Sequence, residues 1–129
     1  MSGQAPSAAA IEQLARAALA RIPEPFAGYL KDVVLIVDEL ADDETLDALG
    51  IEDPFDLTGL YHGRPVGDKS AWESGALPDR IHLYRRAILD EWADTGVTLE
   101  ALVSHIVVHE VGHHFGLSDD DMHAIEDGA

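Results

Sequence analysis

A His-Glu-x-x-His sequence at residues 109–113 limits the folds that this chain can adopt more than any other feature. Two histidines four positions apart lie on one face of an α-helix and can direct their imidazoles at the same point. His109 and His113 therefore offer half of a tetrahedral zinc shell. Glu110 lies about 100° further around the helix, where it can accept a proton from a metal-bound water without being a ligand. The motif predicts a helix that carries a hydrolytic metal site.

The residues around the motif predict the helix that it requires. Thr98 is a favourable N-cap, and Glu100 places an acid in the first turn, where the helix dipole stabilises negative charge. Gly116 stands three positions after the second histidine, where a left-handed helix end favours glycine. Between these signals, apolar residues recur at helical spacing: Leu99, Leu102, Val103, Ile106 and Val107. They predict that the helix docks on a hydrophobic core.

An acid after the helix end is the candidate for a third metal ligand. A chain that turns back at Gly116 brings the next few residues towards the metal. Asp119 lies six positions after His113 and would complete a His, His, Asp shell with water in the fourth position. Ser118 followed by three acids also predicts the start of a final helix, a role that Asp119 can combine with metal binding. The alternative ligands are Asp120, Asp121 and Glu126.

The other histidines are expected outside the metal shell. His105 shares the face of His109 and His113, but its rise to His113 is about 12 Å, too far for both to bind one ion. We expect His105 to pack beside the site and His114 to point away from it. Surface positions or satisfied hydrogen bonds are expected for His62, His82 and His123.

The motif and two upstream segments resemble a known family. Residues 109–119 are similar to the zincin metallopeptidases, including the extended form His-Glu-x-x-His-x-x-Gly-x-x-His/Asp. The segments Gly-Leu-Tyr-His-Gly-Arg-Pro at 59–65 and Leu-Pro-Asp-Arg-Ile-His-Leu-Tyr-Arg-Arg at 77–86 resemble the small bacterial zincin-like metallopeptidases. The resemblance covers most of residues 57–119.

This resemblance implies a minimal zincin-like fold with Zn²⁺ on His109 and His113 and with Glu110 as the general base. It also implies that a sheet edge near the metal pairs with an extended peptide. We expect residues 80–86 to form that edge.

The remaining segments predict an α+β fold, with a small mixed sheet packed against a backing helix and the metal-site helix. Residues 7–21 predict the backing helix, since an apolar face recurs along them and two prolines follow. The continuous β-branched run at 32–38 predicts a strand covered on both faces, near the sheet centre. Residues 63–79, which include Trp72, predict a flap packed beside the site. Further strands are predicted at 57–62 and 80–86 and a short helix at 43–50.

Length and composition indicate the class of protein. The 129 residues predict a single domain, 1–129, with residues 1–6 as a flexible tail. The chain has no cysteine, which excludes disulfides and thiolate metal sites. A net charge of −17 argues against nucleic acid and anionic membranes as partners. Because neither a signal peptide nor an apolar run of about 20 residues is present, we expect a cytoplasmic protein.

The charges are distributed unevenly along the chain. All eight Lys and Arg residues lie between Arg16 and Arg86, whereas the last 43 residues carry ten acids and five of the seven histidines. An acidic field in this segment would concentrate divalent cations.

The sequence therefore predicts a zinc-dependent metallopeptidase that acts on a peptide or protein substrate. Zn²⁺ on His109, His113 and Asp119 activates a water, and Glu110 is the general base. The alternative is a metal-binding or interaction module without hydrolysis on the same scaffold, since no methionine turn follows the motif. The oligomeric state is not predicted.

Overall fold

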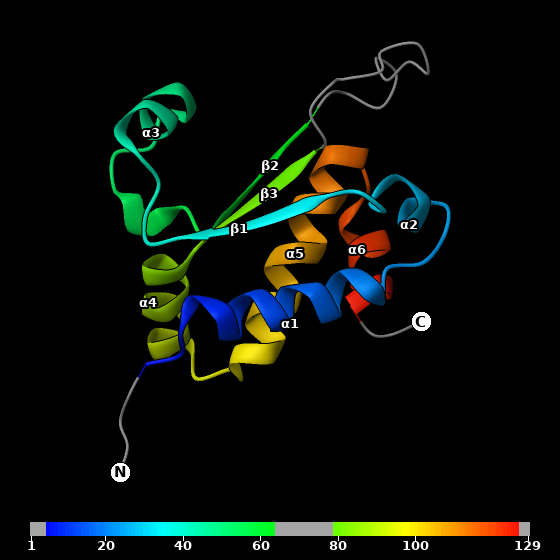
Figure 1. Cartoon of the computed structure of the whole chain (residues 1–129), viewed down its shortest axis with the longest axis horizontal. Helices are drawn as coiled ribbons and strands as arrows, with labels where there is room; N and C mark the ends of the chain where they lie inside the picture. Colours follow the sequence, from blue (N-terminus) through cyan, green and yellow to red (C-terminus); the bar gives the residue numbers. More distant parts are fainter. Residues whose placement is uncertain (1–4, 64–78, 127–129) are drawn as a thin grey trace.

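The computed structural model describes residues 5–63 and 79–126 as an α+β fold (Figure 1). Its helices are α1 (Ala8–Ala20), α2 (Phe26–Tyr29), α3 (Asp43–Leu49), α4 (Arg85–Thr95), α5 (Leu99–Phe115) and α6 (Asp119–Glu126), with a 3₁₀ turn η1 (Pro54–Asp56). Its strands are β1 (Val34–Asp38), β2 (Gly59–His62) and β3 (Arg80–Tyr84), in the spatial order β1-β3-β2. β3 is parallel to β1 and antiparallel to β2, so the sheet is mixed. The predicted fold class is confirmed.

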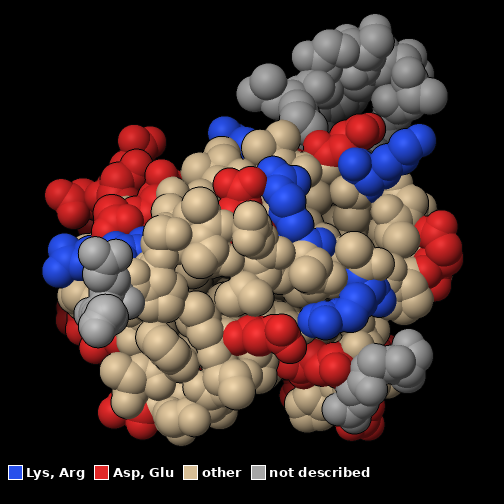
Figure 2. Space-filling view, turned by 60° about the horizontal axis from the view of Figure 1, so that its bottom comes forward, with Lys and Arg blue, Asp and Glu red and all other residues tan. Residues whose placement is uncertain are grey.

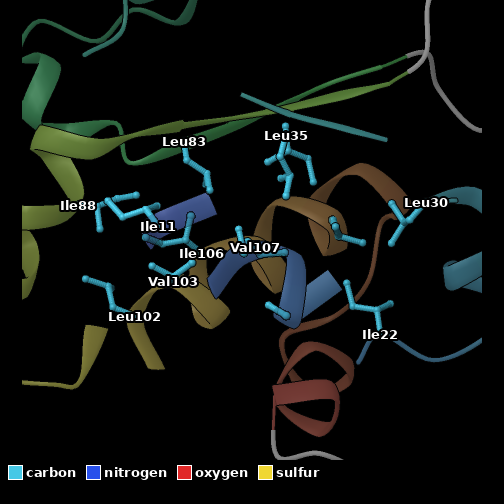
Figure 3. Packing of buried hydrophobic residues seen from close by; sticks show 14 residues of the cluster. Ile11, Ile22, Leu30, Leu35, Leu83, Ile88, Leu102, Val103, Ile106 and Val107 are labelled. Atoms are coloured by element: carbon cyan, nitrogen blue, oxygen red, sulfur yellow. The ribbon is translucent and has the colours of Figure 1, made fainter. Parts of the chain in front are cut away.

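Helices α1 and α5 pack against each other on one face of the sheet (Figure 1). Figure 3 shows Leu35 and Leu83 pointing from the sheet towards Ile11 of α1 and Val107 of α5. Burial of side chains of this size contributes about 1.5–3 kcal/mol each. The metal-site helix therefore docks on a hydrophobic core, as its apolar stripe predicts.

The helix ends follow the capping signals in the sequence. The side chains of Ser7 and Thr98 each accept a hydrogen bond of 3.1 Å from a backbone N–H at the starts of α1 and α5. Gly116 ends α5 with φ 72°, in the left-handed region that favours glycine. Gly50 ends α3 in the same way, with φ 70°. The three helices begin and end within one or two residues of the predicted positions.

The strand order differs from the prediction in two places. The run at 32–38 predicts a central strand, but β1 lies at one edge of the sheet. That prediction was wrong because only one face of β1 is well covered: Leu35 is buried, whereas Val34 is 39% exposed. Residues 80–86 predict the substrate-binding edge, but β3 lies in the centre, with a neighbour on each side. The edge beside α5 is β2.

The predicted flap at 63–79, with Trp72, and the predicted tail at 1–6 lie almost wholly outside the described residues. In the parts of the chain that are described, no helix combines the length and hydrophobicity needed to cross a lipid bilayer. Figure 2 shows one face of the molecule, on which Lys and Arg side chains form separate groups between acidic and neutral residues. Among the described residues of this face, the basic groups make no continuous stripe of the kind that follows a nucleic-acid backbone.

Gly112 lets α6 lie directly against α5. A Cβ at this position would be 2.6 Å from Met122 Cγ and would also overlap Met122 Sδ. Met122 has only 1% of its surface exposed, so it has little room to move aside. Because Gly112 lies between the two histidines of the motif, this contact attaches α6 to the metal-site stretch of α5.

We predict that Gly112→Ala destabilises the protein by about 1–2 kcal/mol. Alanine is favoured over glycine in a helix by about 1 kcal/mol, but overpacking a core contact costs about 1–3 kcal/mol, and an overlap this close lies at the upper end. Urea unfolding followed by circular dichroism measures the difference in free energy.

Gly28→Ala, in α2, is the control for this substitution. Its Cβ would meet no atom closer than 3.4 Å, so this variant should be neutral or slightly stabilising. A Gly112→Ala protein as stable as the wild type would contradict the close contact between α5 and α6.

Candidate active site

Helix α5 presents three rows of side chains, each made of residues four positions apart. The first row is buried in the core and consists of Val103, Val107 and Val111. The second row lies along β2 and consists of Ile106, Glu110 and His114. The third row consists of His105, His109 and His113, and its first two members contact Glu126 at the end of α6. Glu110 is thus beside the histidine row without belonging to it, as the spacing of the motif predicts.

Strand β2 lies close to α5 because Gly59 has no side chain. A Cβ on Gly59 would be 2.9 Å from Ile106 Cγ2. One helical turn further along α5, the Tyr61 N–H donates a hydrogen bond of 3.2 Å to Glu110 Oε1. Helix and strand therefore run side by side from Ile106 to Glu110.

The N–H of Tyr61 lies on the side of β2 that has no neighbouring strand among residues 5–63 and 79–126. The Tyr84 N–H donates to the Thr58 carbonyl at 2.9 Å, which makes these two residues a hydrogen-bonded pair. Hydrogen-bonded and non-hydrogen-bonded pairs alternate in an antiparallel ladder, so the backbone groups of Gly59 and Tyr61 point away from β3. Glu110 thus accepts its hydrogen bond from the outer edge of β2.

Glu110 is half-buried between α5 and β2. Burial raises the pKa of its carboxyl above the ordinary value, and the Tyr61 N–H and the nearby His113 offset part of that rise. A carboxylate with a raised pKa takes up a proton more readily. The position therefore suits a general base.

A second set of contacts holds Tyr61. Its hydroxyl donates to Asp79 Oδ2 at 2.7 Å, and its ring stacks on His114 with the centroids 4.0 Å apart. Burial, and then the bond to Asp79, raises the pKa of the Tyr61 hydroxyl, which therefore stays protonated. His114 therefore packs on Tyr61, the strand residue that binds Glu110, and is not part of the histidine row.

The histidine row contains both predicted metal-binding histidines. The rings of His109 and His113 are edge-on, with centroids 6.0 Å apart. The rings of His105 and His109 are closer, at 4.0 Å. His105 and His113 are exposed, whereas only 20% of the His109 side chain is exposed. The row therefore offers two pairs at i, i+4 spacing, and His109 belongs to both.

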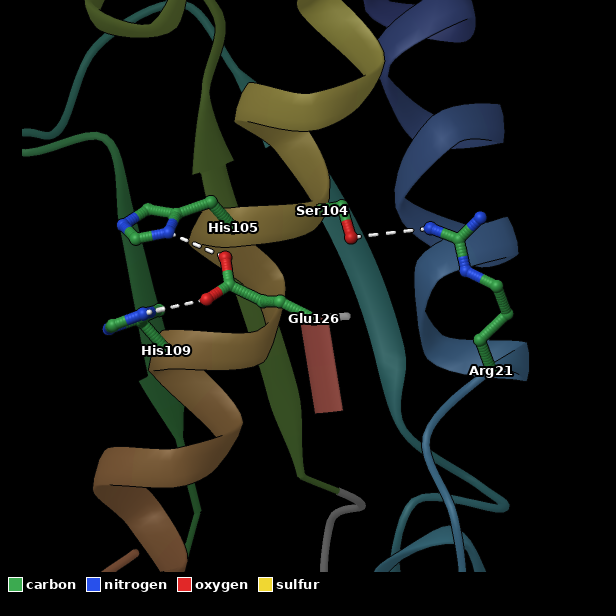
Figure 4. Close-up of polar contacts among 5 residues, drawn as sticks. All are labelled: Arg21, Ser104, His105, His109 and Glu126. Atoms are coloured by element: carbon green, nitrogen blue, oxygen red, sulfur yellow. Dashed lines mark hydrogen bonds and ion pairs between the residues drawn. The ribbon is translucent and has the colours of Figure 1, made fainter. Parts of the chain in front are cut away.

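Glu126 brings a carboxylate to this row from the end of α6 (Figure 4). Its Oε1 is 2.6 Å from His105 Nδ1, and its Oε2 is 3.4 Å from His109 Nε2. Among the described residues, His105, His109 and Glu126 form a group whose ligand atoms all lie within 4.8 Å of one another. The predicted ligands His113 and Asp119 are outside this group. Asp119 lies at the exposed start of α6 with the alternative ligands Asp120 and Asp121, which are also outside the group.

From the sequence, Glu126 is predicted only as an alternative ligand and His105 only as a residue that packs beside the site. The signal for His105 was its i, i+4 spacing to His109, the same spacing as in the motif. Glu126 lies seven residues after Asp119, which is about two helical turns. Both acids would therefore lie on the same face of the final helix.

Another histidine pair lies on the far face of the sheet. The rings of His62 and His82 are 4.8 Å apart, and His82 Nδ1 is 3.2 Å from Asp38 Oδ2. With Asp42 and Tyr84 they line a cavity of about 420 Å³. Side chains of β3 alternate between the two faces, so the sheet separates this cavity from α5.

A family model for zincin-like metallopeptidases matches residues 30–129. The chain belongs to the zincin-like metallopeptidase family. The matched span of this zincin-like protein includes the whole sheet, α5 and α6, and leaves out α1. A search of curated proteins found no match.

Zinc is the metal that the zincin-like family implies, and the residues of the histidine row fit it. His109 Nε2 is buried and has no hydrogen-bond partner among the described residues, a need that a metal bond would satisfy. Burial, and then the nearby His105, lowers the pKa of His109, so its imidazole is neutral at pH 7, as a ligand must be. Imidazoles together with a carboxylate are a donor set of hydrolytic zinc sites.

We predict that Glu110→Gln stabilises the metal-free protein at pH 7. Its raised pKa means that the fold disfavours the ionised carboxylate, so the wild type loses stability as the pH rises past the ordinary glutamate pKa of about 4.3. Glutamine stays neutral, and its oxygen still accepts from the Tyr61 N–H. The melting temperature of the variant should be a few degrees higher near pH 7, and the gain should vanish near pH 4.

Glu52→Gln replaces an exposed carboxylate and is the matched control. It should change the melting temperature little at either pH. A metal-free Glu110→Gln protein that melts at or below the wild-type temperature at pH 7 would contradict the cost of burying this carboxylate.

Proposed function

We propose that this protein is a zinc-dependent metallopeptidase that hydrolyses peptide bonds in a peptide or protein substrate. The observation that carries the proposal is the position of Glu110. It follows His109 in the motif and accepts a hydrogen bond from the outer edge of β2. Glu110 thus lies between the histidines that would hold the metal-bound water and the strand edge that would hold an extended peptide. A base in this position adjoins both reactants.

His109, His113 and Asp119 would hold the zinc ion. When bound, zinc lowers the pKa of a coordinated water to about 7 and polarises the scissile carbonyl. The two histidines are one turn apart on α5, and Asp119 begins α6 three residues after the helix end at Gly116. This arrangement supports a ligand set drawn from two consecutive helices.

Glu110 would act first as general base and then as general acid. Its carboxylate accepts a proton from the attacking water and gives that proton to the leaving amine as the C–N bond breaks. The half-buried position supports this role, because burial raises the pKa of the carboxyl and so favours proton uptake. The hydrogen bond from the Tyr61 N–H orients the carboxylate.

We propose that the substrate binds along β2, and not along β3 as the sequence favours. Strand addition requires outward-facing backbone groups. On β2 these are the N–H and carbonyl of Gly59 and the carbonyl of Tyr61, since the Tyr61 N–H is occupied by Glu110. β3 is paired on both sides within the sheet. A peptide on the edge of β2 would lie beside Glu110.

We predict that Glu110→Gln lowers kcat by about 10²–10⁴-fold and leaves zinc binding in place, because glutamine cannot take up the proton. Cleavage of a peptide library by zinc-loaded protein measures turnover, and plasma mass spectrometry measures the zinc content. Glu100→Gln, at an exposed acid on the same helix, is the control and should keep wild-type turnover. Full turnover in Glu110→Gln would remove this carboxylate from the mechanism.

The same assay separates the peptidase from a metal-binding module without hydrolysis. Chelation should abolish peptide cleavage by the wild type, and added zinc should restore it. Zinc-loaded wild-type protein that cleaves no peptide would favour the non-catalytic alternative.

We predict that Asp119→Asn lowers kcat/KM at limiting zinc by at least about tenfold, a loss of about 1.4 kcal/mol in transition-state stabilisation. Activity measured against the free zinc concentration checks this. Asp120→Asn and Asp121→Asn make the same change of charge in the same exposed turn and should retain activity. A tenfold loss in one of these two instead would transfer the third-ligand role to that residue.

A further inference from the structure

A second group of metal-binding atoms lies one helical turn from the motif. His105 and His109 repeat on α5 the i, i+4 spacing of His109 and His113. Glu126 supplies a carboxylate from α6, and Figure 4 shows it pointing between the two rings. All three ligand atoms lie within 4.8 Å of one another. Two imidazoles and one carboxylate form a donor set that binds zinc.

Two distances within this group lie on either side of the separation of ligand atoms around a bound ion. Two ligand atoms on a tetrahedral zinc are about 3.3 Å apart when each bond is about 2.0–2.1 Å. Glu126 Oε2 and His109 Nε2 are 3.4 Å apart, and this pair lacks hydrogen-bond geometry. Glu126 Oε1 and His105 Nδ1 are 2.6 Å apart, so this pair must open by about 0.7 Å to admit an ion. The His105 side chain is 50% exposed and has room to make that change.

The surroundings give an ion a route to these residues. A cavity of about 370 Å³ adjoins them, lined by His105, Glu126, Glu91, Val97 and Leu102, among others. The carboxylates of Glu91 and Glu126 make the potential at its wall negative, and apolar walls strengthen the attraction of a cation.

We propose that His105, His109 and Glu126 form a second site for a divalent cation, which excludes an ion from His109 and His113. His105 and His113 are about 12 Å apart along the helix, so one ion cannot use both. His109 is required in both places, and its single outward nitrogen binds one ion at a time. If the proposed function holds, an ion in the second site is not bound by His113 and Asp119. The enzyme is then inactive.

Zinc titration of a protein without the motif ligands tests the site. The variant His113→Ala/Asp119→Ala removes two exposed residues and keeps His105, His109 and Glu126. Isothermal titration calorimetry should find about one zinc per chain in this variant. Addition of Glu126→Gln, or of His105→Ala, should weaken that binding by at least about tenfold. Circular dichroism verifies that each variant is folded.

Glu91→Gln in the same background is the matched control, since it removes a carboxylate of the same cavity that is outside the metal-binding group. It should leave the affinity within about twofold. The proposal is overturned if the double variant binds no zinc, or if Glu126→Gln and His105→Ala leave its affinity unchanged. Either result would reduce the contact of Glu126 with His105 to an ordinary hydrogen bond.

Zinc stoichiometry of the wild-type sequence tests the exclusion. One zinc per chain should be found, and Glu126→Gln alone should still bind one, at the motif. Two zinc ions per chain in the wild type would overturn the exclusion. Loss of all zinc in Glu126→Gln alone would support the second site and overturn the catalytic ligand set of the preceding subsection, so the two failures are distinguishable.

Discussion

The contact between Gly59 and Ile106 sets the distance between α5 and the sheet, and the candidate site depends on that distance. A Cβ at position 59 would overlap the Ile106 side chain. One turn further along α5, the same separation puts Glu110 within 3.2 Å of the Tyr61 nitrogen. The apolar core thus holds the Glu110 carboxylate in a position where burial disfavours its ionised form. The free energy of packing the valine row of α5 offsets this local cost.

The parts of the fold that could be predicted from the sequence are those with local causes. Thr98 and Gly116 end α5 through contacts within a few residues, so the helix boundaries were readable in the sequence. Strand order has a different origin. β3 lies between β1 and β2 although it follows both in the chain, and no periodicity within a strand reports its neighbours. The run at 32–38 was apolar enough for two covered faces, yet Val34 remains exposed.

The candidate site divides in the same way. His109, Glu110 and His113 are placed by helical spacing alone, which makes their relative positions predictable. The contact of His105 with Glu126 joins residues 21 apart and depends on the direction in which the chain turns after α5. The sequence contains the spacing of His105 but not that direction. The hydrogen bond from the edge of β2 to Glu110 joins residues 49 apart, so it could not be predicted from the sequence either.

The contact of Met122 with Gly112 also fixes where the two ends of α6 lie. This contact lies between Asp119, at one end of α6, and Glu126, at the other. The two residues are seven positions apart on one helix, a rise of about 10.5 Å along its axis. Because α6 is a single short helix, its packing at Met122 sets the positions of both carboxylates together, and a shift of the helix at this contact displaces both at once.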